Sequence, residues 1–180
     1  MLYDVIIIGS GPAGISASLY TKRAGLETLI VSKGIGTLYK VEKIENYYGT
    51  PNISGKEIQK IGENQAKNLN IEIKNEEVMQ IDYGRNFIVK TLNYEYEAKT
   101  IIIATGSNRK VANIKGIKEF EGKGVSYCTT CDGFFYKDKD VAVLGNKEYA
   151  IHEAQNLLPI AKSVTMLTNG EQSVKKEQKV

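Results

Sequence analysis

The sequence is poor in metal ligands and has no segment that could span a membrane. It contains two cysteines, one histidine and no tryptophan in 180 residues. A structural zinc site needs about four ligands, and Cys128, Cys131 and His152 supply too few, so no metal site is expected. No apolar run approaches the ~20 residues that a membrane-spanning helix requires. We therefore expect neither a zinc protein nor a membrane partner.

The sequence also lacks a large excess of positive or negative charge and an export signal. The formal net charge is only +3, and the lysines near residue 180 are interleaved with Glu177 and Gln178. This is typical of a solvated tail and not of a nucleic-acid patch. Residues 1–4 carry no basic segment, and the apolar run behind them has the length of a strand, so no secretory signal is predicted. We therefore expect no nucleic-acid partner and a cytoplasmic location.

The two cysteines that are present form a C-x-x-C-D-G motif at residues 128–133. Because only two residues separate them, the sulfurs of Cys128 and Cys131 can meet across one tight turn and cycle between dithiol and disulfide. In a reducing cytosol such a pair is more typical of catalysis than of a structural staple, and the alternative is two buried thiols. Asp132 can hold or donate a proton beside the pair, or it can cap a helix.

A glycine-rich turn at residues 9–14 follows the first predicted strand. Residues 4–8 form a short β-branched run that is typical of a strand buried on both faces. In a dinucleotide-binding unit, Gly9 would make the tight turn, Gly11 would admit a pyrophosphate and Gly14 would let a helix pack close to the strand. The alternative is a purely structural turn.

A helix over residues 15–24 and a buried strand over residues 27–31 complete this predicted unit. The acid that usually follows the second strand, where it binds a ribose hydroxyl, is absent. Ser32 and Lys33 stand there instead. A serine can still donate or accept one hydrogen bond, so the pyrophosphate end of a ligand is better supported than its adenosine end.

Between residues 54 and 106 the pattern predicts a helix, a small antiparallel meander and a return to the parallel sheet. Ser54 and Glu57 form a capping-box start for a helix that ends near residue 69. Residues 100–104 are a buried strand, and the small residues after it let a backbone approach a ligand. The meander, inserted into the α/β unit, is predicted over residues 71–73, 78–81, 87–89 and 94–96.

A second strand-turn-helix unit is predicted beyond a boundary near residues 108–116. Its strands span residues 140–144 and 163–167, and its helix lies at about residues 150–158. The turn between them has one glycine where two or three are expected, and Glu148 would place a negative charge near any phosphate. The predicted fold class is α/β, with a Rossmann-like domain that holds the meander, followed by a degenerate Rossmann-like domain that carries the C-x-x-C motif.

Together these motifs resemble the bacterial low-molecular-weight thioredoxin reductases. The resemblance runs over nearly all of the chain, and residues 124–135 carry its most specific part, C-x-x-C-D-G-F-F between two nucleotide-binding halves. The other matching stretches are residues 9–14, Glu45-Asn46 with Gly49, and residues 104–106.

The resemblance implies an FAD-binding domain, a degenerate and truncated NAD(P)-like domain with the disulfide, and a polar tail, at residues 1–110, 114–170 and 171–180. Members of this family continue past the second domain and return to close the first. We therefore expect a truncated product that binds FAD weakly or in part. The full-length protein would be a homodimer.

The resemblance also assigns roles to single residues. Cys131 matches the sulfur nearest the flavin, Cys128 matches the sulfur that exchanges with thioredoxin, and Asp132 matches the acid that manages protons. A noncovalent FAD would be held by the glycine turn, the end of the second strand and two further loops. The implied cofactor-binding residues are Gly9, Gly11, Pro12, Ala13, Gly14, Ser32, Lys33, Thr37, Asn46, Ala104, Thr105 and Gly106.

The chain departs from the family pattern where NADPH would bind. The turn at residues 145–150 lacks the family's G-x-G-x-x-A motif. Residues 167–170 occupy the position at which members of the family have an H-R-R-x segment that binds the 2′-phosphate of NADPH. Thr37 also replaces a flavin-contacting glutamine, and Tyr48 replaces a usual proline. Members without NADPH motifs are the ferredoxin-dependent flavin thioredoxin reductases of clostridial-type bacteria, to which the resemblance is closest.

The sequence thus predicts a flavin-dependent thioredoxin-disulfide reductase, in which two electrons pass from FAD through the Cys128–Cys131 dithiol to thioredoxin. The implied donor is ferredoxin. Two alternatives stay open. One is an NADPH-dependent thioredoxin reductase with a divergent site, and the other is a non-catalytic FAD-binding or partner-binding module.

Overall fold

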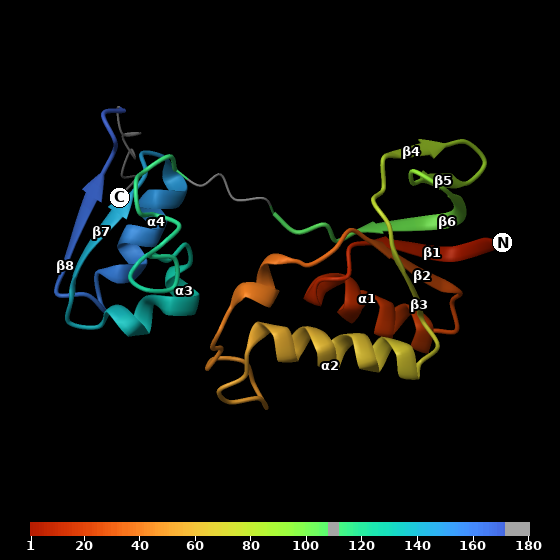
Figure 1. The fold of residues 1–180 in the computed structure, drawn as a ribbon, viewed down its shortest axis with the longest axis horizontal. Helices are drawn as coiled ribbons and strands as arrows, with labels where there is room; N and C mark the ends of the chain where they lie inside the picture. Colours follow the sequence, from red (N-terminus) through yellow and green to blue (C-terminus); the bar gives the residue numbers. More distant parts are fainter. Residues whose placement is uncertain (108–111, 172–180) are drawn as a thin grey trace, which may run out of the picture. The chain divides into compact units, whose positions relative to one another are not determined.

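The computed structural model describes residues 1–107 and 112–171. The chain forms two compact units, Met1–Lys110 and Val111–Val180, which Figure 1 shows with their helices and strands labelled. Within the described ranges no helix has both the length and the apolar character needed to cross a membrane. The predicted polar tail, residues 171–180, lies outside these ranges except for Glu171.

A six-stranded sheet forms the first unit, in the order β3-β2-β1-β6-β5-β4. β1 pairs in parallel with β2 and β6, and β2 pairs in parallel with β3, whereas β4, β5 and β6 pair antiparallel. The strands are β1 (Leu2–Ile8), β2 (Thr28–Ser32), β3 (Glu72–Asn75), β4 (Gln80–Tyr83), β5 (Phe87–Lys90) and β6 (Glu95–Ile103).

Two α-helices and one short 3-10 helix belong to the described part of this unit. They are α1 (Pro12–Arg23), η1 (Thr37–Lys40) and α2 (Gly55–Asn68). The predicted capping box is confirmed at the start of α2, where the Ser54 hydroxyl accepts from the Glu57 N–H at 3.2 Å and the Glu57 carboxylate accepts from the Ser54 N–H at 2.9 Å. These reciprocal bonds fix the first turn of the helix.

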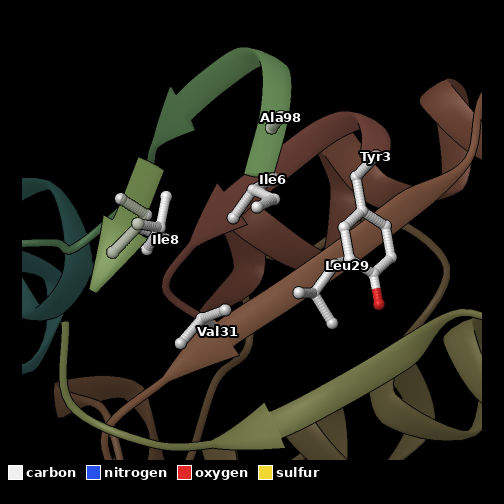
Figure 2. Close-up of a cluster of buried hydrophobic side chains, with 7 residues drawn as sticks. Tyr3, Ile6, Ile8, Leu29, Val31 and Ala98 are labelled. Carbon is white, nitrogen blue, oxygen red and sulfur yellow. The ribbon is translucent and has the colours of Figure 1, made fainter. Parts of the chain in front are cut away.

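The core of the first unit lies on both faces of β1 and β2. Successive residues of a strand point to opposite faces, so the continuous apolar run of β1 supplies both layers. One layer contains Tyr3, Ile6, Ile8, Leu29, Val31, Val89 and Ala98, most of which Figure 2 labels. The other contains Val5, Ile7, Ile15, Ile30, Ala66 and Ile71.

The second unit has a smaller scaffold. Its two strands, β7 (Asp140–Leu144) and β8 (Ser163–Leu167), pair in parallel. Ahead of them come α3 (Thr129–Asp132) and η2 (Gly133–Tyr136), and between them lies α4 (Glu148–Leu157). The predicted strand-helix-strand order is therefore present, with the cysteine motif placed on α3 just before it.

Two predictions about strand pairing were wrong in detail. Residues 71–73 were predicted in the antiparallel meander, but β3 pairs in parallel with β2, because the α2 crossover returns the chain in the same direction. Residues 94–96 and 100–104 were predicted as separate strands, but β6 is continuous. Its first residues pair antiparallel with β5, while residues 97–103 pair in parallel with β1.

Candidate functional site

The glycine turn joins β1 to α1 by close backbone packing. Gly9 has a φ of 111°, a conformation that side-chain-bearing residues rarely adopt. A Cβ on Gly9 would collide with the Ala104 carbonyl, and a Cβ on Gly14 would collide with the Gly9 carbonyl. Gly11, by contrast, has nothing within 4 Å of where its Cβ would stand. The turn is thus tight on its inner side and open at Gly11.

The open side of the turn coincides with the start of α1. Gly11 is the N-cap and Pro12 the first helical residue, followed by Ala13, and the first turn carries no acidic side chain. Helix N-termini present backbone N–H groups and a partial positive charge, which favour anionic groups. The room at Gly11 and this charge fit the approach of a pyrophosphate.

Ser32, at the end of β2, is tied directly to the glycine turn. Its hydroxyl oxygen accepts from the Ser10 N–H at 3.1 Å and from the Ser10 hydroxyl at 2.9 Å. Gln59 of α2 adds a bond from its Nε2 to the Ser10 carbonyl at 2.7 Å. Lys33 forms an exposed ion pair with Glu77 at 2.6 Å. Our sequence reasoning missed Ser10 and Gln59: the first lies inside the glycine motif, whereas no sequence signal marks the second.

The segment that follows β6 meets the same edge of the sheet. The Ala104 N–H donates to the Ile8 carbonyl at 2.8 Å, and Gly106 has a φ of 71°. Ligands of open α/β sheets bind outside the carboxyl ends of parallel strands. A groove of about 290 Å³ lies here, lined by Ile8, Val78, Met79, Gln80, Ile81, Ile103 and Thr105.

Thr37 and Asn46 are not part of this groove lining. Thr37 begins η1, and Asn46 lies in the loop between Ile44 and Ile53, which form an isolated antiparallel bridge. Both residues are exposed. The structure thus brings together the glycine turn, Ser32, Ala104 and Thr105, and Lys33 and Gly106 come next in the chain. Thr37 and Asn46 lie on flanking segments.

Cys128 and Cys131 form a disulfide, with their Cα atoms 5.3 Å apart. The alternative of two buried thiols is therefore wrong. Cys128 is the N-cap of α3, and its sulfur accepts from the Cys131 N–H at 3.2 Å. Within the second unit Cys128 is half-buried and Cys131 is exposed.

Asp132 is held beside the disulfide by Ser126. The Ser126 hydroxyl donates to Asp132 Oδ2 at 2.5 Å and accepts from the Cys128 N–H at 3.2 Å. Asp132 precedes η2 but makes no capping bond with its side chain, so the helix-cap alternative is not observed. Burial, and secondarily the charge of Asp132, raise the pKa of the nearby Tyr136 hydroxyl. Ser126 was missed because a serine in a loop carries no signal of its own.

The turn between β7 and α4 differs from the first glycine turn. Gly145 has a φ of 153°, and a Cβ there would press on the Ala150 side chain. Lys147, the N-cap, makes no side-chain capping bond, and Glu148 lies in the first turn of α4. Asn146 donates to the Glu171 carboxylate at 2.6 Å. Carboxylates at a helix start oppose the binding of phosphates. Residues 1–107 and 112–171 contain no group of three or more His, Cys, Asp or Glu that could hold a metal ion.

Comparison with known proteins settles the family. A family model described as pyridine nucleotide-disulphide oxidoreductase matches residues 3–179. The chain belongs to the pyridine nucleotide-disulphide oxidoreductase family. The predicted α/β, Rossmann-like fold class is thereby confirmed.

The chain is similar to proteins described as thioredoxin reductases. It is 43% identical to one from Aquifex aeolicus over 174 residues, which are 94% of this chain and 54% of that protein. It is 40% identical to one from Bacillus subtilis over 169 residues, 92% of this chain and 54% of that protein. The chain thus spans about half the length of the curated relatives it matches.

Solved structures give the same result. The thioredoxin reductase from Streptococcus pyogenes matches with a TM-score of 0.89 at 38% identity, covering 98% of this chain and 58% of that one. The thioredoxin reductase from Giardia duodenalis matches with a TM-score of 0.92 at 31% identity, covering 98% and 59%.

Proposed function

We propose that this protein is an FAD-dependent disulfide reductase that passes two electrons from FAD, through the Cys128–Cys131 pair, to thioredoxin. The observation that carries this proposal is the Cys128–Cys131 disulfide with Asp132 held beside it through Ser126. The similarity to thioredoxin reductases supports the choice of partner. A cytoplasmic location and, at full length, a homodimer belong to the same proposal.

The first unit has the features needed to hold FAD. The open space at Gly11 and the start of α1 would receive the pyrophosphate, while Ser32 and the groove beside Thr105 would lie along the rest of the ligand. Bound FAD supplies two-electron oxidation and reduction, which matches the two electrons that one disulfide takes up. In this proposal residues 1–110 are the FAD-binding domain and residues 114–170 the disulfide domain.

The chain's own residues would handle the protons and the sulfur exchange. Reducing the disulfide consumes two electrons and two protons and gives two thiols, and Asp132 is placed to supply one of those protons. The Cys128 thiol then gives up its proton, and its thiolate attacks a sulfur of the thioredoxin disulfide, forming a mixed disulfide and releasing one thioredoxin thiolate, which takes up a proton. The Cys131 thiol likewise gives up its proton, and its thiolate attacks the Cys128 sulfur. This restores the internal disulfide and releases the second thioredoxin sulfur, which is protonated in turn, so that thioredoxin leaves with two thiols.

A single-turnover experiment tests this function. The 180-residue chain is loaded with FAD, photoreduced and mixed with oxidised thioredoxin, and new thioredoxin thiols are counted. We expect two thiols per reduced flavin, and Cys131→Ser should trap a mixed disulfide through Cys128. A protein thiol count that does not change on photoreduction would instead identify a non-catalytic flavin-binding module. If Cys128→Ser traps the mixed disulfide and Cys131→Ser does not, the two cysteine roles are reversed. Cys131 is the more exposed of the two, so this outcome needs a direct test.

We further infer that the electron donor is a ferredoxin, as in the clostridial-type enzymes, and not NADPH. Glu148 and the Glu171–Asn146 pair place carboxylates at the second turn, and residues 167–170 contain no arginine. A hydrogen bond to a charged group contributes about 1.5–3 kcal/mol, so two missing arginines weaken 2′-phosphate binding by roughly 10²–10⁴-fold.

Stopped-flow spectroscopy separates the donors. Reduced ferredoxin should bleach the flavin absorbance rapidly, and NADPH at micromolar concentration should not. Rapid reduction by micromolar NADPH would favour the alternative of an NADPH-dependent reductase with a divergent site.

A further inference from the structure

Helix α4 contacts the cysteine turn on both sides of Cys128. The Thr129 N–H donates to Glu153 Oε2 at 2.7 Å, and the Thr129 hydroxyl donates to the Glu153 carbonyl at 3.4 Å. On the other side, the Tyr149 hydroxyl donates to the Tyr127 carbonyl at 3.2 Å. Tyr149 and Glu153 are four residues apart in α4, so they lie on one face of the helix. Helix α3, which begins directly after Cys128, packs against α4.

The carboxylate of Glu153 lies where its charge can affect a negative charge on the Cys128 sulfur. Its side chain is only 15% exposed, and its second oxygen lies 3.8 Å from His152 Nδ1. Solvent and salt screen a partly buried charge less than an exposed one. Its hydrogen bond also occupies the N–H of the residue that follows Cys128.

A negative charge near Cys128 opposes a second negative charge on that sulfur. Thiolates are stabilised by nearby N–H donors and cations and disfavoured by anions. The disulfide carries no charge, whereas the reduced pair at neutral pH is in equilibrium with its Cys128 thiolate form, so Glu153 destabilises the reduced state relative to the oxidised one. A reduced pair that is destabilised in this way gives up its electrons more readily.

We propose that Glu153 is a positioning residue whose carboxylate charge, held beside the turn by the bond from Thr129, makes the Cys128–Cys131 pair a stronger reductant. Tyr149, on the same face of the helix, bonds to the turn without adding charge. This inference deepens the proposed function, since it concerns the same cysteine pair, but its test needs neither flavin, donor nor thioredoxin.

The test equilibrates the 180-residue chain with glutathione. In this reaction the two thiols of the pair pass two electrons and two protons to one glutathione disulfide, which gives the protein disulfide and two glutathiones. Glu153→Gln keeps an oxygen that can accept from Thr129 but removes the charge. We expect the equilibrium constant for oxidation of the pair to fall about three- to tenfold, and alkylation of Cys128 by iodoacetamide at pH 7 to quicken by a similar factor.

Tyr149→Phe is the matched control, because it removes a hydrogen bond to the same turn and no charge. It should change the equilibrium constant less than about twofold. The proposal is overturned if Glu153→Gln also stays within twofold, or if Tyr149→Phe shifts the constant as much as Glu153→Gln does. Far-UV circular dichroism of both variants shows that they are folded. If Glu153→Gln does not fold, Glu153→Asp, which keeps the charge on a shorter side chain, should leave the constant within twofold, and a larger shift overturns the proposal.

Discussion

The glycines of the first turn differ in whether the methyl group of an alanine would have room. Gly14 faces the Gly9 carbonyl, whereas Gly11 faces open space on the side where a pyrophosphate would bind. Gly14→Ala should therefore destabilise the protein by about 1–3 kcal/mol, the usual cost of overpacking. Gly11→Ala should change stability by less than about 1 kcal/mol and yet weaken FAD binding about tenfold or more.

Urea unfolding and a flavin fluorescence titration of the two variants measure these effects separately. An FAD affinity of Gly11→Ala equal to that of wild type would show that the open side of the turn is not the phosphate site, and it would point to a purely structural turn.

Ser126 and Asp132 show how a side chain acquires a role from its neighbour. Ser126 carries no sequence signal in its loop, and Asp132 is marked only by its place directly after Cys131. The 2.5 Å bond between them, together with the Cys128 N–H bond to Ser126, links the carboxylate to the disulfide. The proton-handling role that we propose for Asp132 therefore depends on Ser126 as well.

Helix α2 depends on its first turn for stability. The side-chain and backbone hydrogen bonds from Ser54 lower the pKa of Glu57. A carboxyl with a lowered pKa stabilises the fold above its ordinary value, and this contribution is lost as pH falls through the folded value. Ser54→Ala should reduce the free energy of unfolding by about 1 kcal/mol at pH 7, and the difference from wild type should shrink as pH falls below 4.5.

Urea unfolding at pH 7 and at acidic pH gives this comparison. Ser54→Thr, which keeps the hydroxyl, should remain close to wild type at both. A Ser54→Ala deficit that is equal at both pH values would mean that Glu57 does not take part in the cap.

The two units differ in how much apolar surface they bury. All of the largest fully buried side chains of the described residues, such as Ile6, Leu29 and Val89, belong to the first unit. In residues 112–171 the buried apolar residues are Ala150, Ala154 and Leu157, while Phe134 is 75% exposed. Because burial of apolar surface drives folding, the second unit should be the less stable one.

Hydrogen exchange measured by mass spectrometry checks this difference. The amides of β1, β2 and β6 should exchange with protection near that of global unfolding, and those of β7, β8 and α4 should exchange faster. Equal protection in both units would show that they unfold as one cooperative structure.

The sequence alone determined the features that depend on neighbouring residues. The apolar run of residues 4–8, the glycine turn and the helix after it follow from periodicity and from the special backbone freedom of Gly9. The capping box at Ser54 and the disulfide at Cys128 and Cys131 follow from spacings of three residues. Each of these is local, so its pattern is readable in a short stretch of sequence.

Only the tertiary structure decided which distant segments meet. Periodicity predicted strands at residues 71–73, 94–96 and 100–104, but no local pattern specified the partners of β3 and β6 or the continuity of β6. The bonds from Ser10 to Ser32 and from Thr129 to Glu153 likewise join residues more than 20 positions apart. Such contacts depend on how whole elements pack against one another, and for that reason the charge next to the cysteine pair became visible only in the folded chain.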